Sequence, residues 1–595
     1  MRNGILLTVI ALAVVSLLVI PSAAKLDRAE ATSRAIIQEA YDSGDIDLDR
    51  KMLLKAYALY APDRLPDSYR GGRIDKCGVP IADEIDRVID ELSPEVADEI
   101  RSLRARPSCT DYIETDHFRI HYNTSGTHKI LNWPDTTYRD AIATAAENSW
   151  NEEVDRLGFN PPPADGGDPD GGGGNDLYDI YVQNLSGVYG YCEGCYTVPS
   201  TPETDCTSFV VIDNDYAGFG YADPQDPMKV TVAHEFCHAL QNAHDYSEDV
   251  WYKECTSVWM EDHIYDSIND YTQYIAYFTS KPYRSIEWND VSGLRIYGSC
   301  IWNFYLAENY GADIIRENWS ACEGGLQTMQ HIDVVLGGYG SSIEEAYADF
   351  ALWNFFTGAR CDGAHYDEGS TWPLVATTMQ YSLYPVEDGA PYSTYLPDHF
   401  GANYIRFSQG AGGYDALQIA YDGPWPGSVP NAAFLATRDQ SGNTAEYGEF
   451  SLNMMGNGEM TVEGWDTLSY VTLIVANQTD NVNDMSYLYD ANQTETGVEE
   501  AVHELALKPA SPNPFTGATS IAYTVPAGGG LVDVTIYDVK GREVRKLVNE
   551  QMPSGDGIAV WDGLDGKGEK VAAGVYFARL NVDGLTASGK LMYLK

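Results

Sequence analysis

The spacing of apolar residues changes twice along this chain, and each change limits what the segment can fold into. From about residue 25 to 110, apolar residues recur every three or four positions among many charges, which is typical of amphipathic helices. Short alternating or apolar runs between 117 and 212 predict strands, and longer helical patterns follow them. From about residue 385, short alternating segments are separated by Gly, Asn, Asp and Pro. We therefore expect an α+β region followed by β-sandwiches.

The N-terminus has the pattern of a signal peptide. Arg2 precedes an apolar run over residues 5–20, and small residues at 21–24 provide a cleavage site before Lys25. The run is short for a membrane span, which needs about 20 apolar residues, and no later stretch is apolar enough to be one. We expect a secreted or cell-surface protein with no membrane span after signal cleavage. Residues 25–112 then occupy the place of a zymogen's helical pro-region.

The charge of the chain excludes some partners. Asp and Glu number 88 against 38 Lys and Arg, a net charge of −50, which repels nucleic acid and anionic membranes. We interpret most of this charge as a solvated acidic surface. One stretch, residues 165–179, places acids among glycines as calcium loops do, although it lacks the EF-hand spacing. Calcium is therefore a second candidate cofactor, and a solvated loop is the alternative that we favour.

The segment His234-Glu235-Phe236-Cys237-His238 lies in a helical pattern over residues 230–241. Residues four apart lie on one face of a helix, so the two histidines can offer their imidazoles to one ion. Glu235 lies beside them, where a carboxylate can accept a proton from water. This is the H-E-x-x-H zinc pattern, in which the metal makes water nucleophilic near neutral pH. The alternative is a helix that carries two surface histidines.

A catalytic zinc ion has three protein ligands, and two residues compete for the third position. Glu254 and Glu261 are seven apart in a Trp-rich helical segment, so both face inward and need a partner. Glu254 would be the ligand, and Glu261 would accept a hydrogen bond from a ligand histidine. His244 instead fits the H-E-x-x-H-x-x-G-x-x-H spacing, but Gln241 replaces the glycine, at a cost of roughly 1–2 kcal/mol. We favour Glu254 over His244.

Tyr297 is a candidate donor to the oxyanion that forms during hydrolysis, with ordinary packing as the favoured alternative. The ten cysteines all precede residue 362 and agree with export. Cys77, in Lys76-Cys77-Gly78-Val79-Pro80, resembles the latency switch of matrix metallopeptidase propeptides. We favour the alternative, a disulfide between Cys77 and Cys109. For the pair Cys192 and Cys195 we favour a structural disulfide over metal binding.

The two helical motifs resemble those of the gluzincin metallopeptidases. The match comprises residues 234–238, then Trp251-x-x-Glu254 with a further acid at Glu261, and it is closest to secreted bacterial members of that group. The resemblance implies zinc bound by His234, His238 and Glu254, with Glu235 as general base, in a zincin-like domain that cleaves protein or peptide substrates. The spacing between His238 and Glu254 is shorter than in many members. The G-x-M-E-N motif of aminopeptidases is absent, which favours an endopeptidase.

The C-terminal region carries a second resemblance, through four motifs in order: 511–515 (SPNPF), 536–542 (IYDVKGR), 561–563 (WDG) and 573–577 (AGVYF). They resemble the type IX secretion sorting domain and, equally, the Ig-like module of the flagellar hook-assembly protein FlgD. The resemblance implies an Ig-like address or anchor recognised by type IX-like secretion machinery.

The sequence thus predicts five consecutive segments of a multidomain chain. They are a signal peptide (1–24), a helical pro-region (25–112), a zincin-like α+β catalytic domain (113–382), a β-sandwich (383–502) and an Ig-like sorting domain (503–595). The predicted function is a secreted zinc endopeptidase. The alternatives are a metzincin-like site that uses His244, and a non-catalytic surface adhesin, which would have no need of Glu235.

Overall fold

The computed structural model describes residues 27–594, apart from short segments at 199–200, 202–203, 290–292, 323–326, 425–428, 454, 496–504 and 527–528. The predicted signal peptide lies outside the described residues. Within them, no helix combines the length and the apolar character that crossing a membrane requires. The chain divides into two compact units: Met1–Thr378 with Tyr395–Tyr404 and Ile474–Asp484, and Met379–Thr394 with Ile405–Leu473 and Met485–Lys595.

The first unit contains a six-stranded sheet of order β1-β5-β6-β4-β3-β2. Strands β3, β4 and β6 pair in parallel, β5 runs antiparallel to β6, and β1 adds to β5 in parallel. Every residue of β4 and β6 is buried, which agrees with their largely apolar sequences. The strand bounds are β1 Asp75–Cys77, β2 Asp111–Glu114, β3 Phe118–Tyr122, β4 Tyr178–Gln183, β5 Val188–Thr197 and β6 Cys206–Asp213.

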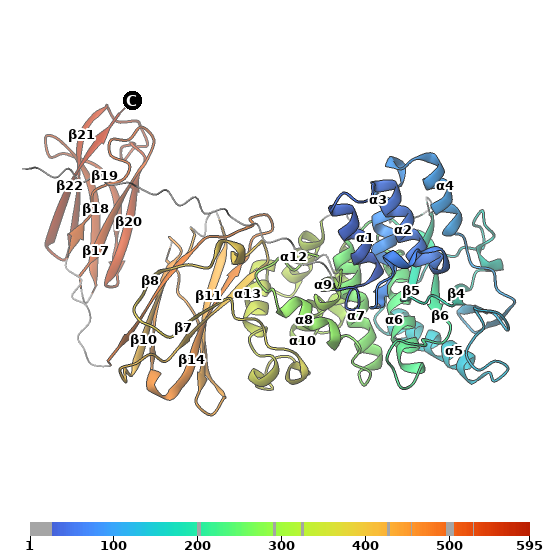
Figure 1. Cartoon of the computed structure of the whole chain (residues 1–595). Coiled ribbons are helices and arrows are strands. Elements are labelled where there is room, and N and C mark those ends of the chain that lie inside the picture. The colour runs from blue at the N-terminus through green and yellow to red at the C-terminus, as the bar shows by residue number, and fades with distance from the viewer. Residues whose placement is uncertain are drawn as a thin grey trace, which may run out of the picture. The chain divides into compact units, whose positions relative to one another are not determined.

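Helices from the N-terminal segment pack against this sheet (Figure 1). Met52, Ile85 and Ile100 form one apolar core with Val188 and Phe209 of the sheet. The segment is not helical throughout, as the sequence had suggested, because it also supplies strand β1, and Pro94 starts a new helix after Val88. Its helices are α1 Ser33–Asp42, α2 Leu48–Tyr60, α3 Val79–Val88 and α4 Pro94–Leu103.

Among the remaining helices of the unit, α5 lies between β3 and β4 in sequence, and α6 to α13 follow β6. α5 and α6 also pack on strands, where Phe236 of α6 contacts Phe118 of β3 with ring centroids 5.1 Å apart. α6 and α7 lie side by side and are almost entirely buried. The helices are α5 Thr137–Ser149, α6 Gln225–Gln241, α7 Val250–Tyr265, α8 Thr272–Thr279, α9 Arg295–Gly298, α10 Ile301–Tyr310, α11 Asp313–Cys322, α12 Thr328–Gly338 and α13 Ile343–Trp353.

Two further sheets follow in residues 379–494, of orders β12-β11-β14-β9-β7 and β13-β10-β15-β8. Tyr381 of β7 and Tyr489 of β15 join the two sheets through a hydrogen bond of 2.8 Å between their hydroxyls. The strands are β7 Met379–Tyr381, β8 Val386–Gly389, β9 Ala402–Ser408, β10 Ala416–Asp422, β11 Asn431–Asp439, β12 Thr444–Glu449, β13 Asn457–Glu463, β14 Leu468–Asn477 and β15 Leu488–Thr494.

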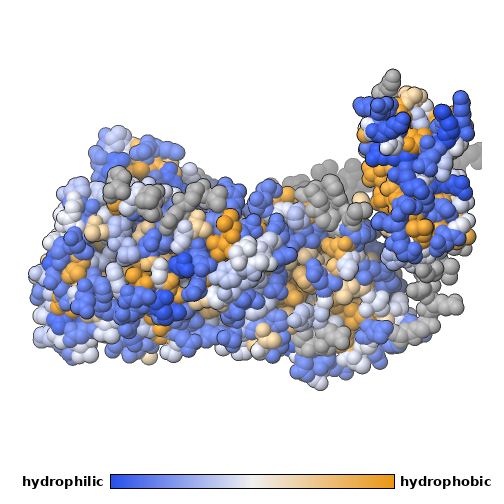
Figure 2. All heavy atoms as spheres, turned by 180° about the vertical axis from the view of Figure 1, so that it is seen from behind, coloured by the Kyte–Doolittle hydropathy of each residue, from blue (hydrophilic) through white to orange (hydrophobic). Residues whose placement is uncertain are grey.

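The C-terminal part is an Ig-like domain with sheets of orders β16-β17-β20 and β19-β18-β21-β22. Its core includes Trp561, which contacts Phe515 and Tyr593. The strands are β16 Ala506–Leu507, β17 Thr519–Val525, β18 Gly530–Asp538, β19 Glu543–Met552, β20 Gly555–Trp561, β21 Gly574–Val582 and β22 Leu585–Tyr593. A multidomain chain that mixes helices with several sheets and ends in an Ig-like domain is thus confirmed. Hydrophilic residues predominate on the face shown in Figure 2.

The cysteines correct two predictions. Cys77, Cys109 and Cys192 all have free thiols, so the favoured disulfides of Cys77 with Cys109 and of Cys192 with Cys195 are wrong. The cause is the position of β1, which directs Cys77 Sγ toward His238, while Cys109 Sγ accepts a hydrogen bond from Gln183.

Replacing Asp262 on α7 by Asn should stabilise the protein in a pH-dependent way. Burial, followed by the charges of Glu368 and other nearby acids, raises the pKa of Asp262 to about 8. The folded state therefore retains a proton that the unfolded chain releases near pH 4, so stability falls as pH rises from 4 to 8.

We expect Asp262→Asn to raise the melting temperature at pH 8.5 and to leave it nearly unchanged at pH 4. Each kcal/mol corresponds to about 2–4 °C in a domain of 150–250 residues. The control in the same thermal scans is Asp155→Asn, at an exposed position. A gain of equal size at both pH values would contradict the prediction.

Candidate metal centre

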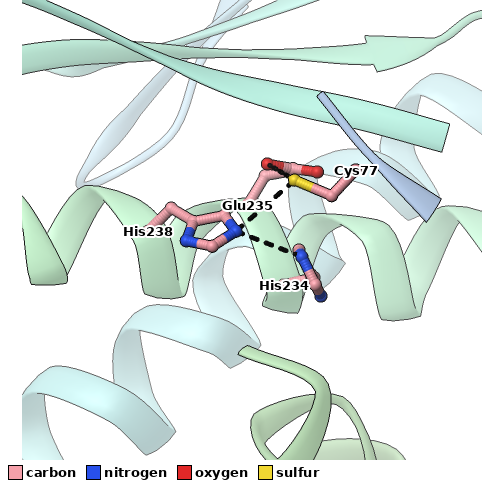
Figure 3. A group of neighbouring side chains, drawn as sticks. All are labelled: Cys77, His234, Glu235 and His238. Carbon is pink, nitrogen blue, oxygen red and sulfur yellow. Dashed lines mark hydrogen bonds between the residues drawn. The ribbon is translucent and has the colours of Figure 1, made fainter. Parts of the chain in front are cut away.

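Helix α6 brings the two histidines of the predicted motif together. His234 and His238 are one turn apart, and their Nε2 atoms lie 3.1 Å from each other (Figure 3). Both side chains are buried, at 1% and 2% exposure. The helix is buried on nearly all sides, so these polar rings face the protein interior and not water.

Glu254 of α7 completes this group. Its carboxylate oxygens lie 3.2 Å from Nε2 of His234 and 3.4 Å from Nε2 of His238. Both oxygens are buried, and neither makes a hydrogen bond within the described part of the chain. Burial alone would raise the pKa of Glu254, but the neighbouring histidines outweigh it and lower that pKa to about 2. The carboxylate is therefore ionised, and the two imidazoles are the groups that face its buried charge.

The far side of each imidazole is held by another side chain. His234 Nδ1 lies 2.7 Å from Glu261 Oε1, as predicted for Glu261 from its position on the helix. His238 Nδ1 lies 2.8 Å from Gln241 Oε1, an interaction that the sequence analysis missed. The signal was present, because Gln241 follows His238 by one helical turn. Hydrogen bonds of this kind fix the tautomer and direct Nε2 toward a metal.

Strand β1 places Cys77 at the same centre. Its Sγ lies 3.4 Å from His238 Nε2 and 3.5 Å from Glu235 Oε2 (Figure 3). Gly190 pairs with Cys77 across β1 and β5. A Cβ atom at Gly190 would lie 2.7 Å from Cγ2 of Thr231 and 3.0 Å from Cγ of Glu235, so glycine permits α6 to approach the strand this closely.

Donor atoms of Cys77, His234, Glu235 and His238 all lie within 4.8 Å of one another, so this cluster can hold a metal ion. The spacing tests the fit. Tetrahedral zinc with bonds of about 2.0–2.1 Å to N and O holds those ligand atoms roughly 3.4 Å apart. Glu254 is not one of these four residues, but the separations among its oxygens and the two Nε2 atoms are 3.1, 3.2 and 3.4 Å. Imidazole and thiolate donors suit zinc and not calcium or magnesium.

Glu235 and Tyr297 approach the same cluster from different elements. Oε1 of Glu235 is buried without a hydrogen-bond partner in the described residues, and burial raises the pKa of this carboxyl. The Tyr297 hydroxyl donates to the backbone carbonyl of Cys77 at 3.4 Å, and burial raises the pKa of that phenol as well. Both side chains therefore lie against Cys77 of strand β1.

Two other predicted sites lie apart from this cluster. His244 Nε2 accepts a hydrogen bond from the backbone N–H of Asn160 at 3.2 Å. In the acidic loop, the Arg106 guanidinium lies 2.7 Å from Asp165 and 2.9 Å from Asp179. Arg106 thus neutralises part of the negative charge of this loop. Calcium binding there stays a prediction.

A cavity of about 660 Å³ lies beside the cluster. His238 contributes to its lining together with Gly194 and Tyr196 of β5 and Val79 of α3. The space along β5 therefore continues beyond Cys77, between the sheet and the N-terminal helices.

Comparison with known proteins identifies one part of the chain. Residues 511–584 match the family described as FlgD Ig-like domain. This agrees with the resemblance seen in the C-terminal motifs, and it says nothing of the metal cluster. No curated protein matches the chain.

Solved structures match only weakly. They include PorZ, a surface component of the type-IX secretion system of Porphyromonas gingivalis, with 18% identity over 20% of this chain and 15% of that one, at a TM-score of 0.12. Dimeric latent PorU from the same organism matches at 15% identity over 37% and 19%, with a TM-score of 0.13. A β-1,2-glucanase from Parabacteroides distasonis matches at 9% over 35% and 36%, with a TM-score of 0.14. The chain spans between 15% and 36% of these proteins, and such scores support no inference about fold or function.

The two candidate third ligands can be separated by metal analysis. Glu254→Ala should lose most of the bound metal, because its carboxylate oxygens lie 3.2 and 3.4 Å from the two Nε2 atoms. His244→Ala should retain metal at the wild-type level. The measurement is the zinc content of each purified variant after dialysis against buffer with trace zinc. Loss of metal from His244→Ala alone would overturn the assignment.

Proposed function

We propose that this protein is a secreted zinc endopeptidase of the gluzincin type. The observation that carries the proposal is the convergence of His234, His238 and the buried carboxylate of Glu254, with Glu235 adjacent. These three residues would hold the zinc ion, which when bound supplies Lewis acidity that activates water and polarises a peptide carbonyl. The α+β part of the first unit would be the zincin-like domain.

Glu235 would act as general base and then as general acid. Its buried carboxylate can take a proton from the attacking water and return it to the leaving amine. Burial raises the pKa of this carboxyl, which makes it a stronger base toward the attacking water. Tyr297, which stays protonated, would donate a hydrogen bond to the carbonyl oxygen as negative charge develops there.

The N-terminal segment would keep the enzyme latent. Strand β1 pairs with β5 at the metal cluster, where an extended substrate could add to the sheet in the same way. Cys77 Sγ lies within 3.5 Å of both Glu235 and His238, so its thiolate could take the open position of a zinc ion held by the three ligands. Latency through Cys77 thus combines a blocked cleft with an occupied metal position.

The flanking parts would serve export. The signal peptide would direct the chain out of the cytoplasm, and the Ig-like domain would be the address read by a type IX-like secretion system. The two sheets of residues 379–494 would form the predicted β-sandwich between the enzyme and this address.

The role of Glu235 as general base can be tested without removing a metal ligand. Glu235→Gln should lower casein hydrolysis by about 10²–10⁴-fold, the range that general base catalysis contributes. Its zinc content should equal that of the wild type, because Glu235 is not one of the three proposed ligands. Hydrolysis that persists in this variant, or that persists in the wild type after chelation, would overturn the proposed reaction.

The latency role of Cys77 has a matched control in the same segment. Cys77→Ala should raise the peptidase activity of the full-length chain several-fold, because the fourth metal position becomes open. Cys109→Ala removes another free thiol of the N-terminal segment and should leave the activity low. Mass spectrometry of each sample shows that residues 25–112 remain attached. Equal activity in the two variants would contradict the switch.

A further inference from the structure

We propose that the cleft contains a subsite for a basic side chain, formed by Glu261, Asp270 and Tyr189 and occupied in this structure by Lys76. This inference rests on the proposed peptidase function and names its substrate class. The substrates would be peptides with Lys or Arg at a position adjacent to the bond that is cut.

The contacts of Lys76 define the subsite. Its Nζ lies 2.7 Å from Glu261 Oε2, and it also donates to Asp270 Oδ2. The ring of Tyr189 lies against the same ammonium, with its centroid 4.7 Å away. Two carboxylates and an aromatic face thus surround one cation, and this combination recognises ammonium and guanidinium groups.

The burial of this group points to a ligand site. Lys76 is 1% exposed, Glu261 1% and Asp270 6%. Each carboxylate uses its other oxygen elsewhere, since Glu261 Oε1 contacts His234 and Asp270 Oδ1 accepts from Gln273. If Lys76 leaves with the N-terminal segment, one oxygen of each acid is left without its cation. Two such buried anions disfavour a neutral side chain and exclude an acidic one.

The strand that carries Lys76 has the position of a bound peptide. Asp75 lies opposite Val188 and Cys77 opposite Gly190, so β1 occupies the edge of the sheet beside the metal cluster. Lys76 is the direct neighbour of Cys77, whose Sγ lies at the metal ligands. An extended substrate on the same edge, with its scissile carbonyl at the metal, can place an adjacent side chain where the Lys76 side chain lies.

Glu261 connects the subsite to the chemistry. One of its oxygens orients His234 and the other accepts from Lys76. A basic substrate residue would therefore restore the charge balance around a carboxylate that positions a metal ligand. We expect the preference to affect the rate of cleavage as well as binding.

The test compares paired peptides with the secreted protein after limited proteolysis has removed its N-terminal segment and Lys76 with it, as verified by mass spectrometry. Quenched fluorescent peptides carry either lysine or its neutral analogue norleucine at each of the two residues that flank the cleaved bond. At one of these positions, the wild type should cleave the lysine peptide with a kcat/KM at least tenfold higher. Asp270→Asn should lower this ratio several-fold, and the exposed Asp266→Asn should leave the ratio as in the wild type.

A second variant keeps the charge balance of the unprocessed chain. If Asp270→Asn fails to fold because Lys76 loses a partner, Lys76→Met combined with Asp270→Asn removes both charges, and the same fall in ratio is expected. Cleavage without preference for lysine, or a ratio unchanged by both variants, overturns the subsite and leaves the peptidase proposal intact. Absence of any cleavage overturns the peptidase proposal and this inference with it.

Discussion

The centre of the first unit depends on one buried interaction, the carboxylate of Glu254 against the imidazoles of His234 and His238. All three side chains are within 2% of complete burial, and they lie on two helices that pack side by side. A buried carboxylate without hydrogen bonds is unfavourable by itself, and it is tolerated here because the two imidazoles face it. Removing one partner from such a group costs about 3–5 kcal/mol. The pairing of α6 with α7 is therefore fixed by charge as well as by apolar packing.

Charges of alternating sign extend this interaction outward. Glu254 faces His234, His234 contacts Glu261, and Glu261 pairs with Lys76, which also pairs with Asp270. Each acid in this series has a base beside it, so none is buried alone. The series crosses from the helices into β1, which means that the N-terminal segment neutralises part of the charge at the metal cluster. A region that the sequence suggests is separate is thus electrostatically part of the site.

The sequence predicted the parts of the site that lie within single helices. The spacing of His234 and His238 places both on one face, and the seven-residue spacing of Glu254 and Glu261 does the same. It could not predict β1, because a three-residue strand has no periodicity and its pairing with β5 joins residues more than a hundred positions apart. The roles of Lys76 and Asp270 depend on that pairing. The Ig-like domain could be predicted from the sequence because its motifs are short and follow one another in a characteristic order.

The same packing sets a condition on how the proposed enzyme could become active. Helices α2, α3 and α4 bury Met52, Ile85 and Ile100 against the sheet, with Val188 and Phe209 on the other side of this core. Cutting the chain after the segment breaks one peptide bond and leaves these apolar contacts and the Lys76 ion pairs in place. Burying each such side chain contributes about 1.5–3 kcal/mol, so the segment would stay bound to the sheet after it is cleaved. Activation would therefore require degradation or displacement of the segment in addition to cleavage, and the acids that lose Lys76 would then face the cleft.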